Sequence, residues 1–126
     1  MSEIKNFIDD LGIAALEANT KIASLAVVSD SGKVVIQTDN WDLTNQANNI
    51  LNVIKGDRSF VLNNLEFSVI ETTTEGIVAT SDSGMGHILF VPFQGGVLVS
   101  YAIPKAEPPK VLSFLKSHAT RLNGQV

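Results

Sequence analysis

The sequence predicts an α+β domain with a central antiparallel β-sheet of about six to seven strands, the N- and C-terminal helices on one face and a further helix on the other. Apolar residues recur at steps of three and four at both chain ends and in one segment between them, which is typical of amphipathic helices. Elsewhere apolar and polar residues alternate between closely spaced turn signals, which is typical of antiparallel strands. With 126 residues, the chain is predicted to form a single domain spanning residues 1–126.

The N-terminal part is expected to form a helix, a hairpin and a second helix. The first helix ends near Asn19, and its apolar face consists of Ile4, Phe7, Ile8, Leu11, Ala15 and Leu16. Residues 22–28 and 33–37 are rich in β-branched side chains and flank an Asp-Ser-Gly turn, which predicts a hairpin. The second helix covers residues 44–55, with Asp42 or Thr44 as its N-cap and Gly56 at its end.

The C-terminal part is expected to be a meander of strands followed by a closing helix. The predicted strands are residues 59–62, 66–72, 76–81, 87–93 and 96–103. Their connections are shorter than the roughly dozen residues that a parallel crossover needs, so neighbouring strands should run antiparallel. Pro108 and Pro109 suit the first turn of a helix whose apolar stripe begins at Val111 and includes Leu122.

The composition excludes several classes of function. The 9 Lys and Arg against 13 Asp and Glu give a net charge of -4, so we expect no nucleic-acid partner. The chain has no cysteine, which excludes disulfides, thiolate metal sites and thiol nucleophiles. The first residues lack the apolar core of a signal peptide, and no apolar run approaches the ~20 residues of a membrane span. We therefore expect a cytoplasmic protein that does not span a membrane.

The residues that could carry catalysis are few and lack the required spacing. His87 and His118 belong to no metal-binding motif, and structural or partner-facing roles explain them more simply. Gly84-Met85-Gly86 lacks the Lys and Ser/Thr of a phosphate-binding loop and leads into a strand. Helix faces, caps and turns account for the paired carboxylates at Asp9/Asp10, Asp39/Asp42 and Glu71/Glu75. The sequence thus predicts a binding module that is not an enzyme and has no cofactor or metal site.

Short motifs along nearly the whole chain resemble the profilin family, whose fold packs both terminal helices on one face of an antiparallel sheet. Asn6–Leu11 is similar to the aromatic-Ile-Asp pattern of the first profilin helix, and residues 26–32 resemble the first hairpin. Residues 56–70 look like the stretch after the second helix, including its Ser-Val-Ile strand. Tyr101–Pro104 resembles the entry to the C-terminal helix of plant-type profilins.

The resemblance implies an actin-monomer-binding protein that regulates actin polymerisation by sequestering or delivering monomers. Its partner would be actin or an archaeal actin homologue, which implies a cytoskeleton-associated location. The implied actin-binding positions are Phe60, Glu66, Glu71, Ala79, Ser81, His87, Leu89, Lys105, Ala106, Glu107 and Pro109.

Several of these positions depart from animal profilins, in which basic residues are familiar where this chain has Glu66, Glu71, Ala79 and Ser81. Either the partner has changed in compensation, or binding rests on an apolar centre around Phe60 and Leu89, two residues that could equally be core. The missing cations also argue against tight phosphoinositide binding.

The family's second site is an aromatic cleft that binds polyproline. The corresponding positions here are Ile4, Phe7, Val35 and His118, with no Trp among them and no C-terminal Tyr. We therefore expect weak or absent polyproline binding. This reduced cleft resembles that of archaeal profilins.

Two alternatives remain open at the level of sequence. A roadblock or longin-like scaffold, which binds small GTPases or trafficking complexes, shares the early order of helix, hairpin and helix. Roadblock modules are generally dimers with fewer strands after the second helix, whereas profilins are mostly monomers, so we expect a monomer. A PAS-like sensor of a small ligand is the third possibility, and it requires a pocket.

Overall fold

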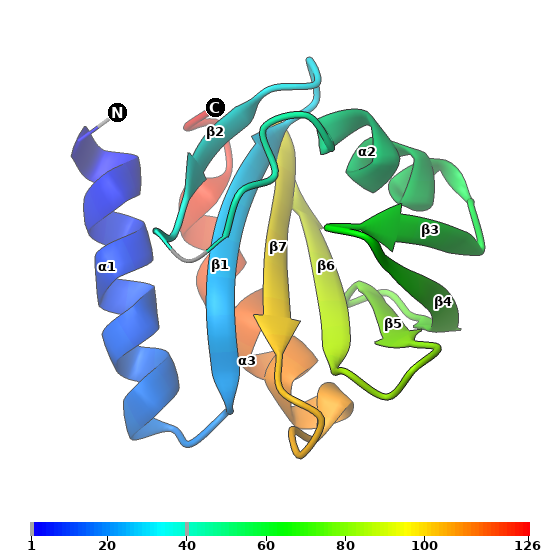
Figure 1. Cartoon of the computed structure of the whole chain (residues 1–126). Helices are drawn as coiled ribbons and strands as arrows, with labels where there is room; N and C mark the ends of the chain where they lie inside the picture. Colours follow the sequence, from blue (N-terminus) through cyan, green and yellow to red (C-terminus); the bar gives the residue numbers. More distant parts are fainter. Residues whose placement is uncertain (1, 40) are drawn as a thin grey trace.

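The computed structural model describes residues 2–39 and 41–126 (Figure 1). The first half of this described chain contains α1 (Ser2–Glu17), β1 (Ile22–Ser29), β2 (Val34–Gln37) and α2 (Ala47–Lys55). The second half contains β3 (Ser59–Leu62), β4 (Leu65–Thr72), β5 (Ile77–Ser81), β6 (His87–Phe93) and β7 (Gly96–Ala102). It closes with α3 (Pro108–Ala119) and the short 3-10 helix η1 (Thr120–Leu122).

The strands form one 7-stranded antiparallel sheet in the order β2-β1-β7-β6-β5-β4-β3. Strands β3 to β7 are a meander joined by tight turns. In the β3–β4 turn, Asn63 and Asn64 adopt φ angles of 50° and 66°, which Asn tolerates better than most residues. β7 then pairs with β1, which leaves β2 and β3 at opposite edges of the sheet. The predicted α+β class and antiparallel sheet are confirmed.

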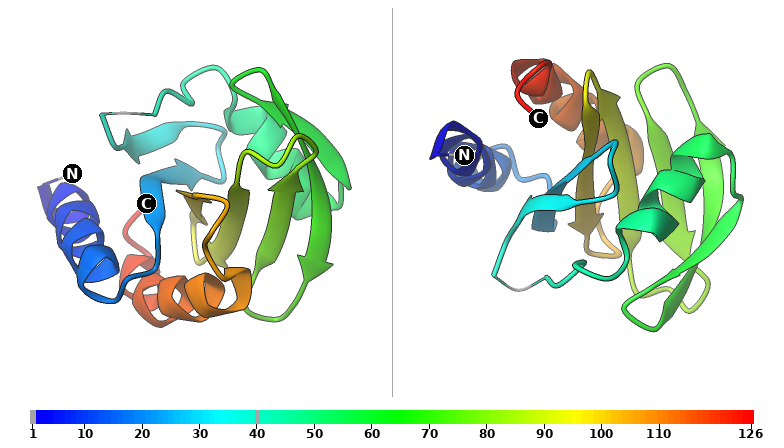
Figure 2. Two further views of the ribbon diagram at one scale, coloured as in Figure 1. Left: turned by 60° about the horizontal axis from the view of Figure 1, so that its bottom comes forward. Right: turned by 90° about the horizontal axis from the view of Figure 1, so that it is seen from above.

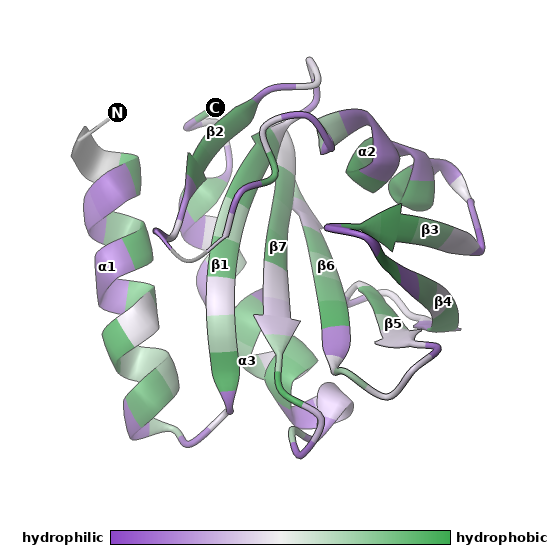
Figure 3. Ribbon diagram, viewed as in Figure 1, coloured by the Kyte–Doolittle hydropathy of each residue, from purple (hydrophilic) through white to green (hydrophobic). Residues whose placement is uncertain are grey.

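The sheet separates two apolar cores (Figures 2 and 3). Leu11 of α1 and Leu115 of α3 belong to one core, and Ile50 of α2 belongs to the other. Consecutive strand residues alternate between them, so Val78 lies in the α1/α3 core and Ala79 in the α2 core. The terminal helices therefore share one face and α2 covers the other, as predicted.

The start of α2 differs from the prediction. The helix begins at Ala47, and its N-cap residue is Gln46, which makes no side-chain capping bond. Asp42 instead forms a local turn, because its carboxylate accepts a hydrogen bond from the Thr44 N–H at 3.1 Å. This bond lowers the pKa of Asp42 from its usual value. Gly56 ends the helix as predicted, at a φ of 126° that favours glycine.

The apolar face of α1 also differs at one position. Leu16 is 80% exposed, so its assignment to the buried stripe is wrong. It follows the buried Ala15 by about 100° around the helix axis, which takes it out of the buried stripe and to the rim of an open hollow between α1 and β1. Ile13 is likewise exposed on α1.

Candidate protein-binding face

α3 covers only part of its face of the sheet. Its buried residues Val111, Leu112 and Leu115 share a core with residues of β1, β5, β6 and β7. Among the described residues, none from β3 or β4 joins this core, so that end of the face lies open. We call it the open face, defined by Val61, Glu66, Ser68, Ile70, Glu71, Thr80 and His87.

Strand register places polar residues in one row across the open face. Ser68 of β4 pairs with Thr80 of β5, and Thr80 pairs with His87 of β6. Thr80 follows Val78 by two residues, and residues two apart on a strand share a side. Because Val78 lies in the α1/α3 core, the whole row faces the α3 side of the sheet.

Two exposed aliphatic side chains lie on the open face, one on each side of the polar row. Val61 is 46% exposed on β3, and Ile70 is 60% exposed on β4. The β4–β5 register shifts between Val69 and Glu71, which is a β-bulge at Ile70. Both residues of a bulge oppose one residue of the partner strand, so Ile70 and Glu71 turn towards the same side. The bulge therefore places an aliphatic side chain in solvent beside a carboxylate.

His87 connects the open face to the segment that enters α3. Its Nδ1 lies 2.9 Å from the Thr80 hydroxyl, and its Nε2 lies 3.4 Å from the Pro104 carbonyl oxygen. Lys105, Glu107 and Pro109 follow directly and are exposed. The start of α3 thus borders the open face.

Carboxylates dominate the charge of this region. Glu66 and Glu71 are exposed on β4, and Asp82 accepts a hydrogen bond from the Ser68 hydroxyl at 2.7 Å. In the β4–β5 turn, Glu75 accepts a hydrogen bond from the α3 residue Ser113 at 3.4 Å. The open face is therefore acidic, with two separate aliphatic side chains among its carboxylates.

Several predicted contact residues are not on the surface. Ala79 and Leu89 are fully buried, and Ser81 and Ala106 are only 5% and 8% exposed. Phe60 lies on the opposite side of the sheet, in the α2 core, where its ring stacks on Phe67 and meets Phe90 edge-on. Of the two interpretations that the sequence left open for Phe60 and Leu89, the burial supports the core one, because alternation along the strands turns both side chains into the cores.

Val61 and Ile70, the exposed aliphatic residues of the open face, were missed by sequence reasoning. The available signal was the consecutive apolar pair Val69-Ile70 within an otherwise alternating strand, which indicates a break in the alternation.

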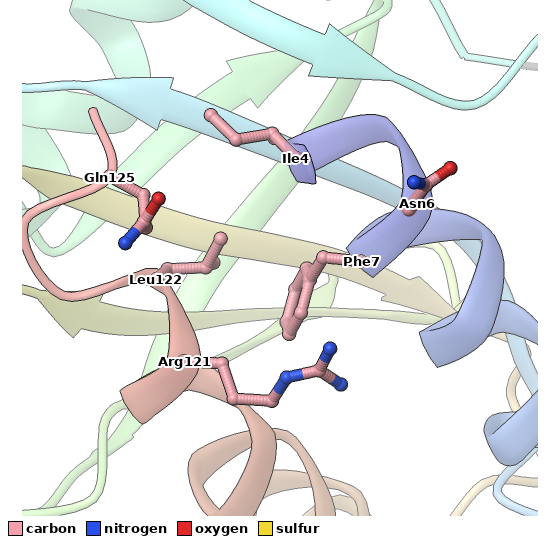
Figure 4. A pocket seen from close by; sticks show the side chains of 6 residues that line it. All are labelled: Ile4, Asn6, Phe7, Arg121, Leu122 and Gln125. Carbon is pink, nitrogen blue, oxygen red and sulfur yellow. The ribbon is translucent and has the colours of Figure 1, made fainter. Parts of the chain in front are cut away.

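The predicted polyproline positions are only partly brought together. Ile4 and Phe7 line a hollow between α1 and the C-terminal residues (Figure 4). Val35 lines the adjoining groove along β2. His118 lines neither; its ring lies 4.6 Å from that of Phe114, and its Nδ1 lies 2.9 Å from the Phe114 carbonyl oxygen.

Neither a metal centre nor a membrane span is found in the part of the chain that the structure describes. No group of three or more His, Asp or Glu residues there could hold a metal ion. None of the helices there is long and apolar enough to cross a bilayer.

Comparison with known proteins identifies relatives over the full domain. No protein-family model matches the chain. It is 33% identical to Loki profilin-1 and 31% identical to Loki profilin-2, both of Lokiarchaeum sp., over 97% of each chain. It is 28% identical to the Thor profilin of a Thorarchaeota archaeon, over 83% of this chain and 85% of the relative.

Solved structures agree with this result. A complex of Loki profilin 2 with rabbit actin matches at a TM-score of 0.86 and 26% identity, covering 100% of this chain and 99% of the profilin chain. The structure of Loki profilin 1 without actin matches at a TM-score of 0.85 and 25% identity, with the same coverage of both chains.

The fold is that of a small α+β domain whose sheet leaves the open face exposed. The 33% identity to Loki profilin-1 over 97% of each chain shows that this chain belongs to the profilin family, and the shared fold agrees with it. Five strands follow α2, so the roadblock alternative is not favoured.

Proposed function

We propose that this protein binds actin monomers through the open face and the start of α3, and regulates polymerisation by sequestering or delivering them. The mechanism is stoichiometric, because one compact domain covers one region of a monomer and no covalent step is involved. A bound monomer cannot nucleate filaments freely.

Two observations support this proposal. Loki profilins 1 and 2 have each been solved with rabbit actin, and both match this chain at a TM-score of 0.86. The open face has the composition of a contact surface, since exposed aliphatic side chains lie among polar and charged ones. Ile70 carries the argument most directly, because a side chain 60% exposed on a strand gains most from being covered.

The charge of the open face suggests which actin it fits. Glu66 and Glu71 stand where animal profilins carry cations, so the matching actin surface would have basic residues opposite them. Lys105 provides the opposite charge at the start of α3. We infer that a cognate actin is preferred over an animal actin.

The proposed actin partner also suggests where the protein acts and which other ligands it needs. A monomer-binding protein acts where actin assembles, so we place it in the cytoplasm with the cytoskeleton. We propose that it acts as a monomer, binds polyproline weakly or not at all, and does not depend on phosphoinositides.

A polymerisation assay tests the proposal. Spontaneous assembly of cognate actin and of rabbit actin is followed with increasing amounts of the protein and of two variants. We expect slower nucleation with the unmodified chain and with Ile13→Asp, and near-normal assembly with Ile70→Asp. Ile13 is the matched control, because it is also 60% exposed but lies on α1. Unaltered assembly of both actins by the folded chain would overturn the proposed function.

A further inference from the structure

His87 is held at the border of the open face by two hydrogen bonds to different kinds of partner. Its Nδ1 lies 2.9 Å from the Thr80 hydroxyl, which can donate or accept, and its Nε2 lies 3.4 Å from the Pro104 carbonyl oxygen, which can only accept. His87 begins β6, and Figure 1 shows the start of β6 at the same end of the sheet as the segment that leads from β7 into α3. The half-buried ring therefore has a fixed place between the sheet and the entry to α3.

These two partners determine where the neutral ring carries its hydrogen. Because the Pro104 carbonyl only accepts, Nε2 must be the donor, and a neutral imidazole then has no hydrogen on Nδ1. The Thr80 hydroxyl therefore donates to Nδ1. When the ring gains a proton, Nδ1 becomes a donor, and the Thr80 hydroxyl accepts from it by turning its own hydrogen away. Both contacts persist in the charged ring, so the charge can change while the ring stays in place.

The charged groups around His87 come from the neighbouring strands and from the start of α3. On the sheet they are carboxylates of β4 and of the turn after β5, and at α3 they are two lysines and one glutamate. They are Glu66, Glu71, Asp82, Lys105, Glu107 and Lys110. β7 contributes Tyr101, whose ring packs on the other side of the sheet. Among the described residues, no carboxylate forms an ion pair with His87, so protonation adds a positive charge that no direct contact neutralises.

His87 is the histidine of the open face, and this sets the pH range in which the charge of the face can change. An imidazole gains or loses its charge between pH 5 and 8, whereas carboxylates and lysines ordinarily do so well outside that range. The chain has one further histidine, His118. It lies in the last turn of α3, where its Nδ1 is 2.9 Å from the Phe114 carbonyl oxygen, whereas the open face borders the start of that helix.

We propose that His87 is a specificity-determining contact residue whose protonation sets the affinity of the open face for actin. This inference rests on the proposed function and adds its regulation by pH. The cognate actin surface opposite Glu66 and Glu71 is inferred to be basic, so a charged His87 weakens that contact. An animal actin matches profilins that carry cations at those positions, so the charged ring strengthens its binding. The two affinities therefore respond to acidification in opposite directions.

Binding titrations at different pH values test the proposal. Dissociation constants for cognate actin and for rabbit actin, both held monomeric in low-salt buffer, are measured between about pH 6 and about pH 8. His87→Gln keeps an N–H that can donate to Pro104 but carries no charge, and His87→Lys is charged throughout this range. His118→Gln is the matched control on α3. Each variant is compared with the unmodified chain on the same actin, so the pH response of the actin itself cancels.

We expect the unmodified chain and His118→Gln to bind cognate actin about threefold more weakly at the lower pH, and to bind rabbit actin more tightly by a similar factor. His87→Gln should lose most of this dependence, and His87→Lys should bind cognate actin weakly at every pH. A pH response that persists in His87→Gln, or cognate binding that strengthens at the lower pH, would overturn the proposal. Absence of binding to either actin at every pH would instead overturn the proposed function, and this inference with it.

A second measurement does not depend on actin. Long-range proton–nitrogen NMR of the free protein reports which ring nitrogen of each histidine carries the hydrogen. We expect neutral His87 to carry it on Nε2, and the amide signal of Thr80 to follow the titration of the ring. A hydrogen on Nδ1 of the neutral ring would contradict the bonding to Thr80 and Pro104, and would overturn the proposal even if actin binding were intact.

Discussion

Glu66 and Glu71 are exposed carboxylates on β4, one on each side of the polar Ser68. At the residue scale they are the charges that should select the partner actin, because like charges across an interface are costly. We expect Glu66→Lys combined with Glu71→Lys to strengthen binding to rabbit actin about tenfold and to weaken binding to cognate actin. Dissociation constants from sedimentation velocity measure both effects.

The control for this swap is Asp9→Lys with Asp10→Lys on α1, which changes net charge equally but lies away from the open face. High salt should reduce the effect of the Glu66 and Glu71 swap, since exposed charges are screened. If both double variants changed the affinity alike, net charge and not the open face would be responsible.

At the scale of elements, the N-cap residue of α2 is hydrogen-bonded to the β3–β4 turn. Gln46 donates to the Asn63 side chain at 2.7 Å, and its oxygen accepts the Asn63 N–H at 2.6 Å. Gln46→Ala removes both bonds and a longer one from the Gln46 amide to the Asp42 carbonyl oxygen at 3.2 Å, so we expect the free energy of unfolding to fall by about 1 kcal/mol. Asn52→Ala, an exposed position on the same helix, serves as the control. Urea unfolding of the two variants measures the difference, and equal stabilities would contradict it.

The elements themselves could be predicted from the sequence, because hydrophobic spacing reports directly which side chains a helix or strand buries. The start of α2 could not, since Asp42 uses its carboxylate in a local turn and Gln46 bonds a residue distant in sequence. The site was predicted less well. Positional resemblance does not say which face a side chain takes, so Phe60 and Leu89 were misplaced and the bulged Ile70 was missed.

At the scale of the whole molecule, the two terminal helices pack on one face of the sheet and α2 packs on the other, and the open face is left uncovered. The sheet edges are short strands, with β2 interrupted by a bulge, which discourages edge-to-edge association. We therefore expect a monomer of 13.5 kDa by size exclusion with light scattering, at all concentrations up to millimolar. A stable dimer would contradict the expected monomer and would favour the dimeric roadblock or longin-like scaffold instead.

The central claim is that the open face contacts actin. Methyl NMR of the 13.5 kDa domain, titrated with unlabelled actin monomer, tests it most directly because it reports on each side chain separately. We expect the signals of Val61 and Ile70 to shift or broaden markedly more than those of Ile13 on α1 and Val35 on β2. The opposite pattern, with Val35 strongly perturbed and Ile70 unchanged, would contradict the account and place the actin contact at the β2 edge.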